Sequence, residues 1–119
     1  MKLKLVGLIA VAVLLLGARP AFAEDMTMCD TPTIAALQDC VNHAVTMGHI
    51  DNAGVAHSLQ AKLGAAQAAQ DRGQVGVAVN VLGAFINEVQ AQAGRHIQTE
   101  HAAHMIMHAQ MVIQALTHP

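Results

Sequence analysis

Aromatic side chains are nearly absent from this chain of 119 residues, which has no Trp, no Tyr and only two Phe, Phe22 and Phe85. Platforms that stack nucleic-acid bases need several aromatic rings. Charged residues make up only 12% of the chain, with 6 basic residues against 8 acidic ones. Without a basic patch the chain lacks the electrostatic footprint of a nucleic-acid-binding protein. Nucleic acid is therefore excluded as an expected partner.

Strand patterns and catalytic motifs are also missing. No stretch alternates polar and apolar residues for long enough to predict a β-strand, so no glycine-rich phosphate loop can join a strand to a helix. Ser58 has His57 beside it, but adjacent helical residues point about 100° apart and cannot form a nucleophile–base pair. Asp39 and Glu88 have no evident partner in the sequence. We expect no enzymatic activity.

Residues 1–23 carry the three parts of a secretory signal peptide. A positively charged start at residues 1–4 precedes an uncharged apolar run over residues 5–16, and the triplet Ala21-Phe22-Ala23 closes the segment. A permanent membrane anchor would need about 20 apolar residues, and Arg19-Pro20 ends this run early. We therefore predict cleavage after the triplet, export to the periplasm or the extracellular space, and no transmembrane segment in the mature chain.

Cleavage changes the composition of what remains. The mature chain would keep three basic residues, Lys62, Arg72 and Arg95, and all eight acidic residues, which gives a formal net charge of −5. Phe85 would be its sole aromatic residue. The core must then be filled by Leu, Ile, Val, Met and many Ala residues. Because small side chains contribute little apolar area each, this core should be thin and should benefit from added constraints.

The two cysteines, Cys29 and Cys40, are the expected constraint, and ten residues lie between them. Such a pair in a small exported chain predicts a disulfide. Closing this loop stabilises the fold by about 3 kcal/mol in the chain-entropy model. The bond forms more easily if the first helix begins near Thr33, with segment 24–32 tied along its side. The alternative is a thiolate metal site with Cys40 and His43, which would need reduced thiols.

Four stretches of the mature chain have the period of an α-helix, and turns of two to five residues separate them. Asp51 is expected to cap the second helix at its N-terminus, and three glycines are expected to end the first three helices. Because short turns favour antiparallel neighbours, we predict an all-α fold, a compact four-helix bundle-like array. The helices are expected over 33–47, 51–72, 75–93 and 99–116 within a domain of residues 33–119, with Gly48, Gly73 and Gly94 as the terminators.

The apolar residues predict which face of each helix is buried. The third helix has a seam of alternating four- and three-residue steps without a gap, as in a coiled coil. Glycines inside helices cost up to about 1 kcal/mol each relative to Ala, so Gly64, Gly76 and Gly83 are expected where helices approach closely. The predicted stripes are Ile34, Leu37, Val41, Ala44 and Val45; Val55, Leu59, Leu63 and Ala66; Val75, Val79, Leu82, Ile86, Val89 and Ala93; and Ala102, Met105, Ala109, Val112, Ile113 and Leu116.

Several stretches resemble the FIMAH domain, a small helical module of exported bacterial proteins. The likeness covers roughly residues 34–116, and its most specific part runs from Phe85 to Gly94. It rests on Gly48-His-Ile50-Asp-Asn52-Ala53-Gly54, on Ser58-Leu59-Gln-Ala61-Lys62-Leu63 and on Leu82-Gly-Ala-Phe85-Ile86-Asn87-Glu-Val89-Gln-Ala91-Gln92 with Gly94.

The resemblance implies a helical module that is commonly appended to the C-terminal end of larger exported proteins, including hydrolases and surface proteins. It offers no catalytic residues to carry over. This chain departs from the usual pattern because the module stands alone, has an N-terminal cysteine pair and is rich in histidine. A function special to this chain is expected to lie in those departures.

The densest group of histidines lies in the fourth helix. His101, His104 and His108 fall within about 60° of arc on a helix, beside the predicted core stripe. Two imidazoles four residues apart can bind one Zn²⁺, Cu²⁺ or Ni²⁺, and the thioethers of Met107 and Met111 would favour Cu(I). The alternative needs no metal, because boundary histidines can cover a helix flank with their nitrogens in water.

Two weaker ideas also follow from the histidines. Protonating all eight near their unperturbed pKa of about 6.5 would make the mature chain cationic and could alter its assembly. Non-covalent haem between the helices is disfavoured, because few aromatic side chains could pack a porphyrin.

The function that the sequence favours is therefore an exported, non-enzymatic helical module that acts through protein–protein or cell-envelope contacts. We expect no cofactor for it. The alternative is a periplasmic or extracellular protein that binds Cu, Zn or Ni through His101, His104 and His108.

Overall fold

The computed structural model describes residue 29 and residues 31–119, and these form four α-helices. Within the described residues there is no strand, only isolated bridges between loop residues. The predicted all-α bundle is confirmed, while the predicted signal peptide, residues 1–23, lies outside the described residues. The helices are α3 (Ile34–Thr46), α4 (Ala53–Asp71), α5 (Val75–Gln92) and α6 (Thr99–Thr117).

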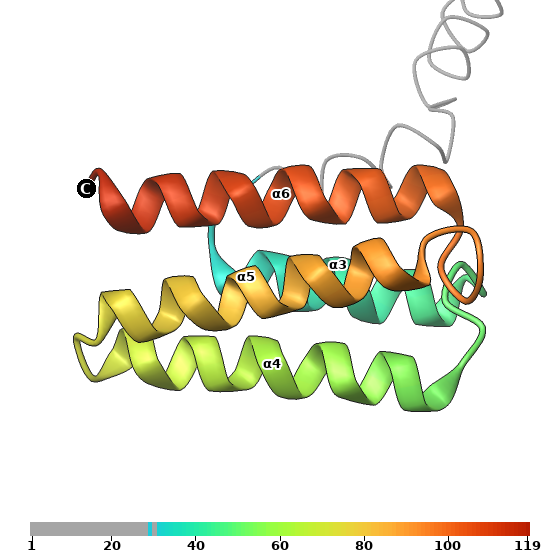
Figure 1. The fold of residues 1–119 in the computed structure, drawn as a ribbon, viewed down its shortest axis with the longest axis horizontal. Helices are drawn as coiled ribbons and strands as arrows, with labels where there is room; N and C mark the ends of the chain where they lie inside the picture. Colours follow the sequence, from blue (N-terminus) through green and yellow to red (C-terminus); the bar gives the residue numbers. More distant parts are fainter. Residues whose placement is uncertain (1–28, 30) are drawn as a thin grey trace, which may run out of the picture.

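The helices run up and down in chain order and close into a ring (Figure 1). Each helix packs against the next one along the chain, and α3 also packs against α6. With 13 residues, α3 is shorter than α4, α5 and α6, which have 19, 18 and 19. One end of the bundle is therefore built from α4, α5 and α6 alone, as Figure 1 shows.

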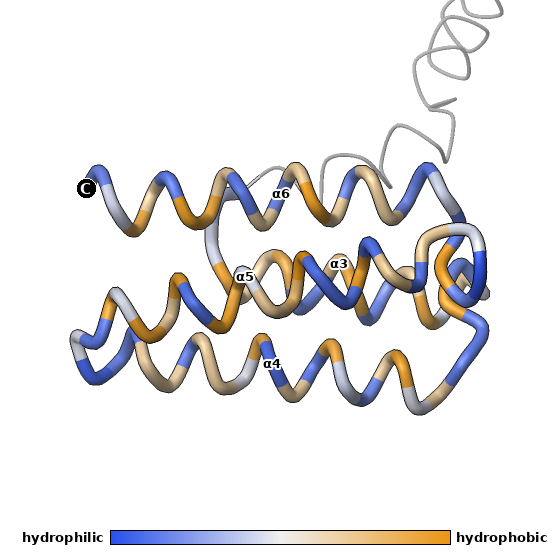
Figure 2. Tube along the Cα trace, in the orientation of Figure 1, coloured by the Kyte–Doolittle hydropathy of each residue, from blue (hydrophilic) through white to orange (hydrophobic). Residues whose placement is uncertain are grey.

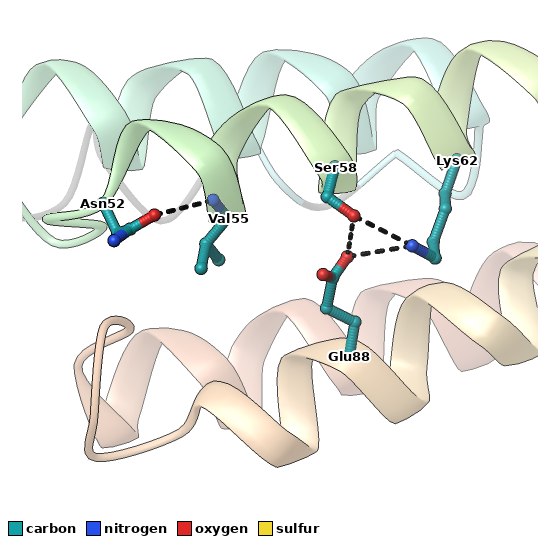
Figure 3. Close-up of polar contacts among 5 residues, drawn as sticks. All are labelled: Asn52, Val55, Ser58, Lys62 and Glu88. Carbon is teal, nitrogen blue, oxygen red and sulfur yellow. Dashed lines mark hydrogen bonds and ion pairs between the residues drawn. The ribbon is translucent and has the colours of Figure 1, made fainter.

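Side chains cap the first two helices at their N-termini. Thr33 Oγ1 accepts a hydrogen bond from the Ala36 amide at 3.1 Å, and Asn52 Oδ1 accepts one from the Val55 amide at 2.9 Å (Figure 3). The prediction that Asp51 caps α4 is wrong. The capping side chain accepts from the amide three residues ahead, and here that side chain belongs to Asn52. The predicted start of α3 near Thr33 is confirmed.

Three glycines terminate helices as predicted. Gly48, Gly73 and Gly94 follow α3, α4 and α5 with φ values of 78°, 72° and 76°. These are the residues of the described chain with positive φ, a conformation that costs a residue with a Cβ atom about 1 kcal/mol or more.

Two loops pair at one end of the bundle. The amide of Asp51 donates to the carbonyl of His96 and the amide of Gln98 donates to that of His49, each at 3.0 Å. Between these bonds Ile50 and Ile97 form an isolated bridge and are 4% and 1% exposed. The α3–α4 turn and the α5–α6 loop therefore close this end of the core with two buried side chains.

The core contains the predicted stripes of α4 and α6, but α5 is rotated from its predicted face. Its buried residues are Ala78, Leu82, Phe85 and Val89, whereas Val75 is 37% exposed. The predicted heptad seam of α5 is wrong at its first residues. The buried face is the one that contains Phe85, the largest side chain in the core, which is fully buried. Figure 2 shows apolar and polar residues alternating along the helices.

The prediction for the helical glycines is also wrong. A Cβ atom built at Gly64, Gly76 or Gly83 would meet no neighbouring atom within 4 Å. These glycines therefore lie over open space and are not points of close helix approach. Their conformational cost to the helices has no packing contact to offset it.

Replacing Gly64 and Gly83 by Ala should stabilise the protein. Each substitution removes unfolded-state entropy inside a helix and is expected to raise the free energy of unfolding by about 0.5–1 kcal/mol. Chemical denaturation with the disulfide intact measures the change. The matched control is Gly73→Ala, which should destabilise because its φ is +72°. Loss of stability at Gly64 or Gly83 would contradict the open-space geometry.

Candidate functional site

The structure places the three predicted metal ligands of α6 in three different environments. His108 is 1% exposed and belongs to the core. His101 stacks on His49 from the α3–α4 turn, with ring centroids 3.7 Å apart. His104 is half-buried, and its Nε2 has no hydrogen-bond partner among the described residues. The three side chains therefore have separate neighbours, and His108 faces the interior rather than the helix flank.

His108 lies with the cysteine pair. Cys29 and Cys40 form a disulfide with their Cα atoms 5.5 Å apart, and each cysteine is 6% exposed. A ring nitrogen of His108 and the two sulfurs all lie within 4.8 Å of one another. In the described part of the chain this is the group of three or more His, Cys, Asp or Glu side chains that is close enough to hold a metal ion. The sequence-based alternative paired Cys40 with His43, whereas the structure brings His108 to the sulfurs.

A single hydrogen bond sets the orientation of the His108 ring. Its Nε2 lies 2.6 Å from the carbonyl oxygen of Thr31. Because a carbonyl oxygen can only accept, Nε2 carries the proton and donates it, which in the neutral ring leaves the lone pair on Nδ1. Nδ1 is buried, and no described residue forms a hydrogen bond with it. A buried polar atom left unpaired costs about 1–3 kcal/mol, so this nitrogen calls for an explanation.

The paired loops at the end of the bundle carry a second group of polar side chains. His96 Nδ1 lies 2.8 Å from Asp51 Oδ1, and both side chains are exposed. They line an open hollow of about 350 Å³ together with His49 and Arg95. The hollow is wide and solvent-exposed, and its imidazole–carboxylate pair joins the two loops that close the core.

A polar clamp of Ser58, Lys62 and Glu88 joins α4 to α5 (Figure 3). Ser58 Oγ donates to Glu88 Oε1 at 2.8 Å, and Lys62 Nζ donates to Ser58 Oγ at 3.0 Å and to Glu88 Oε1 at 3.1 Å. The lysine and glutamate side chains are 31% and 21% exposed. Lys62 acts here as a charged donor rather than as a base for the serine hydroxyl. The arrangement is that of an interhelical contact, and it gives Glu88 the partner that the sequence did not reveal.

Sequence reasoning missed the contact between His108 and the disulfide because it joins positions far apart in the chain. One signal was available. His108 follows Met105 by three residues and precedes Val112 by four, the spacing of residues on one helix face. Both neighbours are buried. His108 therefore lies on the same buried face of α6 as Met105 and Val112.

The fold and these contacts define a class: a small helical module of four antiparallel helices whose N-terminal segment is tied down by a disulfide. The family model for the FIMAH domain matches residues 34–114 of the chain. The chain therefore belongs to the FIMAH domain family, and the resemblance seen in the sequence is confirmed. No match was found among curated proteins or among solved structures.

Removing the disulfide should weaken the fold without abolishing the helices. For a Cys29→Ser/Cys40→Ser variant we expect a loss of about 3 kcal/mol in the free energy of unfolding, because the unfolded chain regains the entropy of an 11-residue loop. Denaturation with guanidinium, followed by circular dichroism, measures the loss. Unchanged stability would show that the tie does not constrain the unfolded chain.

Proposed function

We propose that this chain is an exported, non-enzymatic module that acts through contacts with another protein or with a component of the cell envelope. Export is supported by the leader-like sequence of residues 1–23 and by the disulfide, a bond that persists in oxidising compartments. Within the described residues no helix is long and apolar enough to cross a membrane. The periplasm or the extracellular space is the proposed location.

The outer face of α6 is the observation that carries this proposal. Ala103, Met107, Met111 and Ala115 follow one another at four-residue steps, and all four are exposed. The two methionines are 52% and 39% exposed. Residues four apart lie one above the other on a helix, so these side chains form a continuous apolar stripe, which we call the α6 stripe.

Charge is scarce around the α6 stripe. Apart from its histidines, α6 contains Glu100 as its single ionisable residue. A solvent-facing helix normally presents charged residues on its outer face. Methionine side chains are flexible and polarisable, and they are common on surfaces that adapt to different partners. These properties favour docking of a partner along α6.

The polar side chains that could take part in a reaction support a role without catalysis. Ser58 is held between Glu88 and Lys62, and the buried His108 is engaged with Thr31. A nucleophile needs a base that is free to take its proton and a position for the substrate beside it. Ser58 has neither, and we propose that the module needs no cofactor for its contact role.

Transition-metal binding is a second candidate function. It is supported by the stacked pair of His49 and His101, which brings imidazoles from two elements together. His49 Nδ1 and His104 Nε2 are buried and have no hydrogen-bond partner in the described part of the chain, so they add potential ligands. In this role an envelope protein would hold Cu²⁺, Zn²⁺ or Ni²⁺ through imidazole nitrogens.

Photo-crosslinking tests the contact role. A benzophenone amino acid at position 107 or 111 should form a discrete crosslink to a partner in envelope fractions of the cell that makes the protein. The same probe at position 65, an exposed alanine of α4, should not. Met107→Lys/Met111→Lys should lower crosslinking from position 103 at least tenfold, because it places charge in the α6 stripe. Equal crosslinking from positions 65 and 107 would contradict docking along α6.

Calorimetric titration of the oxidised protein tests the second candidate. His101→Ala/His104→Ala should weaken binding of Cu²⁺, Zn²⁺ or Ni²⁺ at least tenfold, whereas His57→Ala/His118→Ala, at two exposed histidines, should leave it unchanged. His108 is kept because its removal would open a hole in the core. Identical weak binding by all three proteins would eliminate the imidazole site.

A further inference from the structure

We infer that Cys29, Cys40 and His108, with the two thiols reduced, form a buried site for a thiophilic d¹⁰ cation, Cu(I) or Zn(II). The site goes beyond the contact role and does not depend on it. It also differs from the surface imidazoles, because it exists only when the disulfide is open. The metal ion and the disulfide exclude each other, because both use the sulfurs of Cys29 and Cys40.

The first argument is the convergence of ligand atoms. The two sulfurs and a ring nitrogen lie within 4.8 Å of one another. With metal–sulfur bonds of about 2.3 Å and metal–nitrogen bonds of about 2.0 Å, the ligand atoms around one ion lie roughly 3.5–4 Å apart. Breaking the S–S bond removes the constraint that holds the two sulfurs closer than that spacing.

The second argument is the state of the His108 ring. The bond from Nε2 to the Thr31 carbonyl fixes the proton on that nitrogen and leaves the lone pair on Nδ1. Among the described residues Nδ1 has no hydrogen-bond partner, and it belongs to a side chain that is 1% exposed. A metal-binding histidine commonly donates its other ring N–H to a backbone carbonyl in this way, which fixes the tautomer and the ring orientation. The disulfide has no proton to offer Nδ1, whereas a metal ion would engage it.

The third argument concerns which ions fit. Two thiolates and one imidazole are soft and borderline ligands, which select d¹⁰ ions over Mg²⁺ or Ca²⁺. Three ligands match the low coordination number that Cu(I) accepts, whereas Zn²⁺ in structural sites takes four. Charge favours Zn²⁺, because it neutralises both thiolates in a place where each cysteine is 6% exposed. The shared chemistry is thiolate–imidazole capture of one d¹⁰ ion.

Metal binding to the oxidised protein takes two steps, reduction of the disulfide and exchange of the thiol protons for the metal ion. A dithiol reductant gives two electrons and two protons to the Cys29–Cys40 bond, which opens to two thiols while the reductant becomes a disulfide. The metal ion then replaces the two thiol protons, which are released to solvent. A newly made chain with reduced thiols would need only the second step, so metal capture and disulfide formation compete for it.

Competition titration tests the site. The reduced protein, freed of reductant under argon, is titrated against Cu(I) held by bathocuproine disulfonate and against Zn(II) held by pyridylazoresorcinol. Reduced wild-type protein should withdraw one equivalent of at least one ion, and its thiols should then resist alkylation. The oxidised protein should bind that ion at least 100-fold more weakly. Equal binding by both forms, or by the Cys29→Ser/Cys40→Ser variant, would overturn the inference.

His108→Gln isolates the role of the imidazole. The Gln amide can still donate to the Thr31 carbonyl but lacks the Nδ1 lone pair. We expect at least tenfold weaker binding by the reduced variant, with an unchanged circular dichroism spectrum. His57→Gln, at an exposed histidine of α4, is the control and should bind as wild type does.

X-ray absorption of the wild-type adduct gives a measurement that needs no variant. The site predicts two sulfur neighbours and one nitrogen neighbour at the ion. An adduct with sulfur neighbours alone, or unchanged affinity in folded His108→Gln, would remove His108 from the site.

Discussion

A core that combines large apolar side chains with many alanines is the constraint on which this structure depends. Alanine occupies the buried positions 44, 66, 69, 78, 102 and 109, and the side chain of Phe85 is fully buried. Each alanine brings helices close but buries little apolar area, so the hydrophobic stabilisation per residue is modest. Closing the ends of such a bundle contributes more to its stability than in a bundle with larger side chains, because open ends would expose much of the buried apolar surface.

Local ties close the two parts of this core that the helices leave open. At one end the bridge between Ile50 and Ile97 buries two large side chains. Beside α3, the shortest helix, the Cys29–Cys40 bond holds the incoming chain where Thr31 meets His108 of α6. The second tie thus joins the start of the domain to its last helix, and it brings a buried imidazole against the two sulfurs as a consequence.

Much of the fold could be predicted because helix signals are local. The ends of the helices follow from glycines such as Gly48 and from side chains such as Thr33, whose effects are set by the nearest few residues. The buried face of α5 was predicted less well, since Val75 and Val79 fit a heptad seam as well as Phe85 fits the face that is buried. Only the neighbouring helices decide between those two faces, and they select the one that buries the largest side chain.

The candidate site was predicted only in part for the same physical reason. The disulfide follows from the spacing of two cysteines and the start of one helix, both local features. The position of His108 depends on how α6 packs against α3, which no periodicity in α6 specifies. Likewise, Glu88 gained its partner Lys62 only through the packing of α5 on α4. Contacts between distant segments cannot be predicted from local patterns, and both His108 and Glu88 have their partners through such contacts.

The two faces of α6 have separate physical roles on one rigid element. Met107 and Met111 point to solvent, while His108 between them points into the core toward the cysteines. Substituting the methionines therefore leaves the buried cluster intact, and opening the disulfide leaves the α6 stripe in place on its helix. The disulfide ties Cys29 to α3, and the nearby Thr31 carbonyl accepts the hydrogen bond of His108 on α6. The buried imidazole thus links the N-terminal tie to the helix that carries the exposed apolar surface.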